Sequence, residues 1–264
     1  MEWWLGYLGI GAFVGFFAGL LGIGGGAVIV PLLAMLFAAQ GIPRELLLHL
    51  AVGTSMATIL LTSASSVRAH AKRDAVRWDV ARGMTPGIIV GGLAGSAIAG
   101  AFSTLVLACT FTVIVYAAGI NILIDRQPRP GRTLPRAPGM FAAGFVISGV
   151  SSLVALGGAF MSVPFMIWCN MNVRQAIGTA AFIGFPIALV GSIGYVATGW
   201  NAAALPPWSL GYIYLPAMAG VCASSILAAP FGARVSHGTP PRILKRVFGV
   251  LLLAFATRML ISLL

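Results

Sequence analysis

Long stretches of this chain contain no charged residue. Only 16 lysines and arginines and 5 aspartates and glutamates occur among 264 residues, and 59% of the residues are hydrophobic. A soluble domain of this length has charges on about a quarter of its residues, so soluble enzymes and disordered tails are excluded. One membrane-spanning helix takes about 20 apolar residues. The uncharged stretches, each long enough for at least one span, cover the ranges 3–43, 46–67, 83–124, 137–173 and 175–233. The sequence therefore predicts an all-α protein that is surrounded by membrane lipids and crosses the membrane several times.

The basic residues are concentrated in three short segments. Thirteen of the sixteen lie in the ranges 68–82, 125–136 and 234–246. Since loops rich in lysine and arginine stay in the cytoplasm, all three segments are expected on that side. The range 200–208 has no charge, two prolines and a tryptophan at each end, which is typical of the opposite face. The net charge of +11 is therefore interpreted as marking the cytoplasmic loops. No nucleic-acid partner is expected, because the aromatic residues lie in apolar runs and not among the basic residues.

The chain contains an internal repeat. Residues 19–33 (GLLGIGGGAVIVPLL) recur as residues 152–166 (SLVALGGAFMSVPFM). At a constant offset of 133, the first copy shares Gly24, Gly25, Val30 and Pro31 with Gly157, Gly158, Val163 and Pro164 of the second. Residues 49–55 are similarly matched by residues 174–180. The expected parts of the chain are a first repeat over 1–124, a basic cytoplasmic linker over 125–139 and a second repeat over 140–264.

The two copies are predicted to lie in the membrane with opposite orientation. The basic segment 68–82 of the first copy corresponds to the uncharged segment 200–208 of the second, so equivalent loops fall on opposite sides. The apolar block 140–168 is too long for one ordinary helix and too short for two full ones, which a re-entrant hairpin satisfies. Each repeat is therefore expected to hold one glycine-broken re-entrant hairpin and about three full spans. Inverted repeats with broken hydrophobic segments are typical of secondary transporters, whose site lies at the repeat interface near the midplane.

Glycines recur four residues apart in two stretches, at Gly11, Gly15 and Gly19 and at Gly87, Gly91 and Gly95. Small residues at this spacing let membrane helices approach closely, so these stripes are interpreted as packing surfaces. Packing is also the alternative for the glycines of the repeat. A hairpin turn is favoured there because each of three successive glycines costs a continuous helix about 1 kcal/mol.

One sequence pattern is specific enough to indicate a family. The run GLLGIGGG at 19–26 is followed by Pro31 and then by AVGTS at 51–55, and the second copy repeats the pattern in degenerate form. Over almost the full chain this resembles the TauE/SafE family of sulfite and organosulfur-compound exporters, also called the 4-toluene sulfonate uptake permease family. The resemblance implies a multi-pass transporter of small sulfur-containing anions in the bacterial inner membrane. It leaves the exact anion and the direction of transport open.

The broken segments indicate where an anion could bind. Amide groups at the start of a helix have no partner within the helix and carry the positive end of its dipole, so they bind anions without a charged side chain. The candidates are Gly24, Gly25, Gly26 and Ala27 in the first copy and Gly157, Gly158 and Ala159 in the second, with hydroxyl donors from Thr54, Ser55 and Thr179. A sulfite or sulfonate group, with three oxygens, fits such a site.

Two ionisable residues occupy corresponding positions in the two copies. His49 corresponds to Arg174, and they are expected at the outer and the cytoplasmic mouth, where they could attract anions. The alternative interpretation of both residues is that they lie at the membrane interface, where the side chain extends its charged end to the lipid headgroups. No aspartate or glutamate falls within an expected span, which argues against cation transport. Any proton coupling would use His49, protonation of the substrate, or nothing.

Other functions remain as alternatives: a transporter of another small anion or an organic acid, a membrane-embedded enzyme, and an assembly scaffold. An enzyme is disfavoured because the sequence has no Gly-x-Ser-x-Gly nucleophile motif and no HExxH metal motif. Cys109, Cys169 and Cys222 lack the spacing of a metal site. No cofactor or metal is therefore expected, and the oligomeric state is left open.

Overall fold

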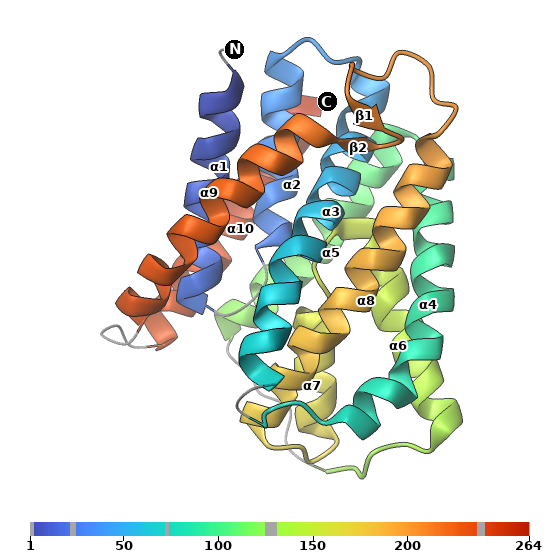
Figure 1. The fold of residues 1–264 in the computed structure, drawn as a ribbon, viewed down its shortest axis with the longest axis vertical. Coiled ribbons are helices and arrows are strands. Elements are labelled where there is room, and N and C mark those ends of the chain that lie inside the picture. The colour runs from blue at the N-terminus through green and yellow to red at the C-terminus, as the bar shows by residue number, and fades with distance from the viewer. Residues whose placement is uncertain (1–2, 22–24, 72–73, 125–130, 237–240, 264) are drawn as a thin grey trace.

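The computed structural model describes residues 3–21, 25–71, 74–124, 131–236 and 241–263. Within them the chain forms ten helices and one small β-hairpin (Figure 1). The helices are α1 (Trp3–Leu21), α2 (Gly26–Ala39), α3 (Arg44–Ala71), α4 (Trp78–Ala101), α5 (Thr104–Ile124), α6 (Ala137–Val154), α7 (Ala159–Trp168), α8 (Val173–Gly199), α9 (Leu215–Ser236) and α10 (Pro241–Leu263), and the strands are β1 (Ser209–Leu210) and β2 (Ile213–Tyr214). The all-α expectation is confirmed, and the hairpin between α8 and α9 is an addition that the sequence did not predict.

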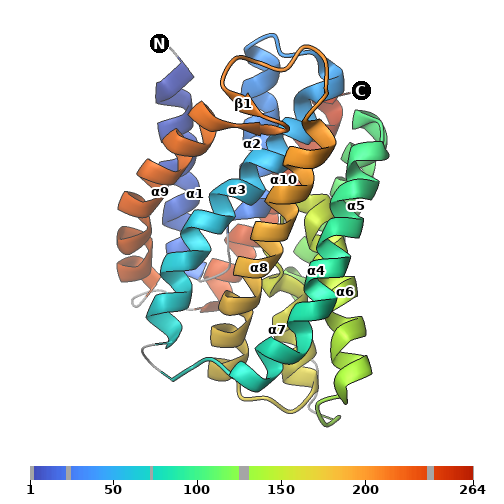
Figure 2. The same cartoon turned by 45° about the vertical axis from the view of Figure 1, so that its right-hand side comes forward.

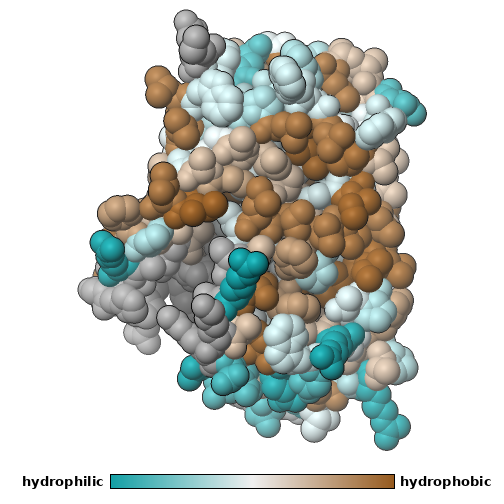
Figure 3. Space-filling view, viewed as in Figure 1, coloured by the Kyte–Doolittle hydropathy of each residue, from teal (hydrophilic) through white to brown (hydrophobic). Residues whose placement is uncertain are grey.

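Six of the described helices are long and apolar enough to cross a membrane. These spans are Arg44–Arg68, Trp78–Ala101, Thr104–Ile124, Ala137–Val154, Val173–Gly199 and Leu215–Gly232. Helices suit lipid because their backbone N–H and C=O groups are paired within the helix. Apolar side chains such as Val113 and Leu227 are exposed on them. Figure 3 shows apolar residues across the middle of the visible face and hydrophilic residues gathered at its lower end. The protein is a multi-pass membrane protein.

Two helix pairs enter the bundle from opposite ends (Figures 1 and 2). α1 and α2 lie in the upper half, and α6 and α7 lie in the lower half. α2 has 14 residues and α7 has 10, fewer than the about 20 that a full span takes. α6 begins at Ala137, earlier than the expected 140, because Arg136 has an extended backbone and Pro138 fits the first turn of the helix. Its 18 residues make it longer than the half-helix that the block 140–168 predicted.

The glycine stripes lie where helices pack most closely. The most extensive contacts join α1 to α9 and α4 to α6. A Cβ atom at Gly11 or Gly15 would overlap α9, and one at Gly87, Gly91 or Gly95 would overlap the backbone of α6. The interpretation as packing surfaces is therefore confirmed for these five glycines, whereas the surroundings of Gly19 lie outside what the structure describes.

The centre of the bundle is built by α3 and α8, which lie side by side in both views. α3 carries the repeated segment 49–55, and α8 carries its counterpart 174–180. Both helices are mostly buried, and the short helices α2 and α7 pack against α3 and α8, respectively. α5 packs on α10 at one side.

The two ends of the bundle differ in composition. The β-hairpin, the α2–α3 turn and the α4–α5 turn lie at the upper end in Figure 1. The described parts of the three basic segments, at the α3–α4 turn, before α6 and at the end of α9, lie in the lower half. The segments that were expected to share one side therefore lie toward one end of the molecule, opposite the segment 200–208.

Candidate anion site at the helix breaks

The first break lies between α1 and α2. Gly24 falls outside the described residues, and Gly25 is the residue from which α2 starts. The Gly25 carbonyl accepts hydrogen bonds from the amides of Val28 and Ile29, each at 3.1 Å. Gly26 and Ala27 are buried at the start of the helix, and no side chain caps it. The amides at this buried helix start therefore have no side-chain acceptor from the N-cap residue.

The second break is more strongly bent. Ala155, Gly157 and Gly158 all adopt left-handed backbone conformations, with φ of 49°, 70° and 74°. Glycine takes this conformation without steric cost, whereas a residue with a Cβ does not. Gly158 starts α7, and its carbonyl accepts hydrogen bonds from the amides of Met161 and Ser162. Ala159, the first residue of α7, is half-buried.

The two breaks touch each other in the core. A Cβ atom at Gly26 would overlap the carbonyl oxygen of Ala155 and lie 2.5 Å from Ile59 of α3. Ile59 is also the neighbour of Gly157, at 3.7 Å from the position of a Cβ there. Ser55, fully buried, donates a hydrogen bond of 3.4 Å to the Gly26 carbonyl. The structure thus brings Gly26, Gly157 and Ser55 together around Ile59 and the Ala155 carbonyl.

The two candidate threonines have a different contact. The hydroxyl oxygen of Thr54 accepts a hydrogen bond from the Tyr214 amide, and that of Thr179 accepts one from the Arg77 amide, both at 2.9 Å. The glycine before each threonine, Gly53 or Gly178, leaves room for a backbone carbonyl of the same connecting segment. Each Gly-Thr pair therefore holds a connection between two helices of the other half of the chain. Their role as substrate donors stays a prediction.

His49 and Arg174 lie at opposite ends of the bundle, but in different surroundings. Arg174 is exposed at the start of α8, where its amide donates to the Asn172 side chain at 2.9 Å. His49 is only 4% exposed. Its ring nitrogens lie 3.2 Å from the Glu45 carbonyl oxygen and 3.1 Å from the Ala99 carbonyl oxygen. His49 is therefore a buried side chain that connects helices, and its role in attracting anions stays a prediction.

Three serines near the second break were not singled out in the sequence. Ser148 and Ser152 of α6 and Ser162 of α7 are fully buried, and their hydroxyls have no hydrogen-bond partner among the described residues. Buried hydroxyls are normally paired, so these three have donor capacity for a ligand. Two of them are spaced four residues apart just before the glycine pair, a pattern that could have identified them. Tyr195 of α8 adds a further contact by donating to the Ser152 carbonyl at 3.0 Å.

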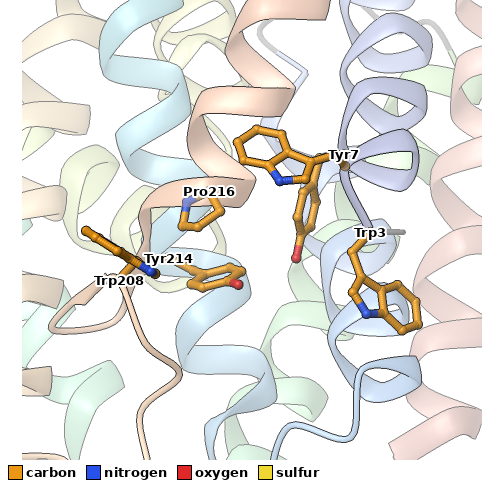
Figure 4. Close-up of a pocket in the computed structure, with 6 residues that line it drawn as sticks. Trp3, Tyr7, Trp208, Tyr214 and Pro216 are labelled. Carbon is orange, nitrogen blue, oxygen red and sulfur yellow. The ribbon is translucent and has the colours of Figure 1, made fainter. Parts of the chain in front are cut away.

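An aromatic cavity of about 360 Å³ opens at the upper end (Figure 4). It is lined by Trp3, Trp4, Tyr7, Trp208, Tyr214 and Pro216. The Gln40 side chain donates to the Tyr7 hydroxyl at 2.5 Å. Tryptophan and tyrosine are enriched at membrane interfaces because their rings are amphipathic. This cluster therefore extends the aromatic belt that was expected for the segment 200–208 to the start of α1.

Comparison with known proteins identifies the family. The profile described as "Sulfite exporter TauE/SafE" matches residues 7–259. The chain belongs to the TauE/SafE family. It is 34% identical over 254 residues to a "Probable membrane transporter protein" of Haemophilus influenzae, covering 96% of each chain. It is 25% identical to "Probable membrane transporter protein YdhB" of Bacillus subtilis, covering 88% of this chain and 90% of the relative. No solved structure matches the chain.

Membership of the TauE/SafE family confirms a membrane transporter and not an enzyme. The same resemblance was visible in the glycine run and the AVGTS segment. The described residues contain no cluster of three or more histidine, cysteine, aspartate or glutamate side chains able to hold a metal ion. The chemistry available at the breaks therefore consists of backbone amides and hydroxyls, which are hydrogen-bond donors suited to an anion.

Proposed function

We propose that this TauE/SafE protein transports small sulfur-containing oxyanions, such as sulfite or organosulfonates, by alternating access between two inverted repeats. The anion binds to the amides at the starts of α2 and α7, with hydroxyl groups around it. The observation that carries the proposal is the contact between the two breaks, in which Gly26 lies against Ala155. Ala155 is the C-cap residue of α6 and lies just before the start of α7, so this contact places the start of α2 close to the segment that leads into α7. Helix N-termini carry the positive end of the helix dipole, which favours an anion in this region.

Corresponding contacts in the two halves support the inverted repeat. If α1 to α5 correspond to α6 to α10, the large α1–α9 contact corresponds to the large α6–α4 contact. The α2–α3 and α7–α8 contacts form another such pair. The Thr54–Tyr214 and Thr179–Arg77 hydrogen bonds also exchange under this correspondence. A pseudo-two-fold relation between the halves accounts for all three pairs.

The closeness of the breaks favours a mechanism in which they separate. Gly26 and Gly157 are buried, and Ile59 packs against both. An anion that uses the amides of both half-helices must therefore displace this contact. Rocking of one repeat against the other would open the breaks toward one end at a time, as in other inverted-repeat transporters.

The charge distribution supports one orientation. The described basic segments lie toward the lower end in Figure 1, so this end is proposed to face the cytoplasm. The β-hairpin and the aromatic cavity then face the outside. The bacterial inner membrane is the corresponding location for such a protein.

Flux of radiolabelled sulfite into proteoliposomes tests the substrate. Competition with sulfonates, sulfate and thiosulfate should rank the anions, and saturable sulfite flux is the expected result. Absence of flux for every sulfur anion, in protein shown to be folded, would contradict the substrate class and favour another anion or an organic acid. Absence of ligand-dependent thermal stabilisation for any small anion would favour a scaffold, since a ligand that binds only the folded state raises its stability.

A further inference from the structure

We propose that His49 is a proton-binding site, and that proton binding there holds the upper end of the transport pathway closed. The inference rests on the transport function proposed above and adds the coupling of substrate access to pH at this end. It is carried by the position of the imidazole ring between three elements and by the cavity that reaches it.

His49 links α3, α4 and the β-hairpin. Nδ1 lies 3.2 Å from the carbonyl oxygen of Glu45, one turn earlier in α3. Nε2 lies 3.1 Å from the carbonyl oxygen of Ala99, in the last turn of α4. The ring also lies against Tyr212, with 5.0 Å between ring centroids and a 33° tilt. Movement of the α4 end or of the hairpin away from α3 must therefore break a contact of this side chain.

Both ring nitrogens face hydrogen-bond acceptors. A neutral imidazole has one N–H donor and one lone pair, so it can satisfy only one of the two carbonyl oxygens. The protonated ring donates to both. The carbonyls in the last turn of α4 also carry the negative end of the helix dipole, which favours a cation at Ala99. The hydrogen bonds to both carbonyl oxygens favour the protonated ring, whereas burial of the ring disfavours its charge. Loss of the proton places a lone pair against a carbonyl oxygen and favours separation.

A cavity of about 530 Å³ connects His49 with the upper end of the molecule. Its rim includes the exposed residues Arg44, Glu45 and Leu105, and His49 and Tyr212 lie buried at its floor. A proton can therefore reach the ring from the aqueous phase at this end without crossing the core.

The other titratable residues that line this cavity are less suited than His49 to bind a proton near neutral pH. The titratable and charged residues that line the cavity with His49 are Arg44 and Glu45 on α3 and Tyr212 on the hairpin. Burial raises the pKa of Tyr212, so its phenol stays neutral. The α4–α5 turn contributes Gly100, Phe102, Ser103, Thr104 and Leu105, and the segment after α8 contributes Ala202 and Ala203. Among these residues, histidine is the type whose charge changes between about pH 5 and pH 8.

The second half of the chain differs at the corresponding position. There the repeat places Arg174, so the second half has no histidine at this position. Arg174 is exposed at the lower end, whereas His49 is buried at the upper end. The pH response is therefore expected at the upper end only.

Thiol labelling tests the site independently of transport. Ala99 is fully buried beside His49, and Ala203 is exposed on the cavity wall. Each is changed to cysteine in a background with Cys109, Cys169 and Cys222 replaced by alanine, and labelled with a membrane-impermeant reagent. The ratio of the Ala99→Cys rate to the Ala203→Cys rate corrects for the pH dependence of an exposed thiol, and the same ratio measured in His49→Gln corrects for the different pKa of a buried thiol.

We expect this ratio to be about tenfold lower near pH 5 than near pH 8, the effect of one charge-assisted hydrogen bond. His49→Gln, which keeps a donor but does not titrate, should remove the difference. His70→Gln, the same change at the other end of α3, should preserve it. An equal ratio at both pH values, or a pH dependence that persists in His49→Gln, would overturn the proposal.

Flux measurements supply a second readout if the Ala99→Cys protein does not fold. Methanesulfonate stays ionised over this pH range, so only the protein titrates. Its flux should depend on the pH at the upper end in the parent protein and should lose that dependence in His49→Gln. If no anion is transported, the transport proposal fails, whereas the proton site is still decided by the labelling ratio.

Discussion

The hydroxyl oxygen of Thr179 accepts a hydrogen bond from the backbone amide of Arg77, which lies 102 positions earlier in the chain. Thr54 does the same for the amide of Tyr214, 160 positions later. Both threonines are fully buried. Each bond fixes the segment that enters the next helix of the other half. The two bonds thus tie the halves of the transporter together at opposite ends of the bundle.

Replacing either threonine with valine should destabilise the protein. Thr54→Val or Thr179→Val keeps the shape but leaves a backbone amide without its acceptor, which costs about 1 to 3 kcal/mol. Thermal unfolding in detergent measures the effect. Thr54→Ser and Thr179→Ser keep the hydroxyl and serve as matched controls. Unchanged unfolding of both valine variants would show that the two bonds contribute nothing to stability.

Gly26→Ala should abolish or strongly reduce transport. The added methyl would overlap the Ala155 carbonyl oxygen and press on Ile59, so the two breaks must move apart; overpacking of this kind costs about 1 to 3 kcal/mol. Gly9→Ala is the control, because a Cβ at Gly9 meets nothing within 4 Å. Anion flux into proteoliposomes is measured for both. Equal flux in the two variants would mean that the contact between the breaks is not needed for transport.

Gly157 and Gly158 should tolerate substitution to different degrees. Both glycines have a left-handed backbone conformation, so alanine at either position should lower the free energy of unfolding by about 1 to 2 kcal/mol. At Gly158 a Cβ would also overlap Ile187, whereas at Gly157 the nearest atom is 3.7 Å away. Gly158→Ala should therefore unfold at a lower temperature than Gly157→Ala, and the bulkier Gly158→Val should lose transport.

A double variant separates strain from overlap at Gly158. Ile187→Val removes the Cδ1 atom that a Cβ at Gly158 would meet. Adding it to Gly158→Ala should restore part of the lost stability, since the effects of substitutions at two residues in contact on the free energy of unfolding are not additive. If Ile187→Val restored no stability, the whole destabilisation by Gly158→Ala would come from the left-handed backbone conformation.

The buried serines should affect transport more than stability. Ser152→Ala and Ser162→Ala remove hydroxyls without a partner among the described residues, so the free energy of unfolding should stay the same or rise. If they donate to the anion, flux at low substrate concentration should fall about tenfold per hydroxyl. Ser192→Ala is the control, because that hydroxyl already donates to the Ala188 carbonyl at 2.7 Å. Unchanged KM and kcat in both variants would remove these serines from the substrate path.

Cysteine labelling should establish the orientation. Ala203 and Arg82 are both exposed, near opposite ends of the bundle. In intact cells Ala203→Cys should react with an impermeant thiol reagent and Arg82→Cys should react only after the cells are opened. The reverse pattern would invert the proposed topology.

Much of the architecture was available from the sequence, because it depends on local composition. The scarcity of charge determined a multi-pass helical protein, and the glycine run at 19–26 determined the first break and the family. The spacing of Gly87, Gly91 and Gly95 was sufficient to predict a packing face. Where the structure differs locally from the expectation, the reason is also local: Pro138 fits the first turn of α6, which begins at Ala137 and not at the expected 140.

The candidate site was predictable only in part. The glycines of both breaks were identified from their repeat, whereas Ser148, Ser152 and Ser162 were not, because a serine in an apolar helix usually donates to its own backbone. Whether such a hydroxyl is left without a partner depends on atoms of other helices. His49 shows the same limit. Its position in the sequence indicated the outer mouth, but nothing in the sequence indicated its contact with the Ala99 carbonyl oxygen in the last turn of α4.

The sequence by itself determined which segments enter the membrane, where the helices break and which loops carry the positive charge, since each of these follows from residues that are neighbours in the chain. The tertiary structure decided what each break touches. The contact of Gly26 with Ala155, the two threonine hydrogen bonds and the enclosure of His49 all join residues that are far apart in the sequence. Such contacts arise from the way whole helices pack, and hydrophobic periodicity carries no information about which distant surface a given side chain will meet.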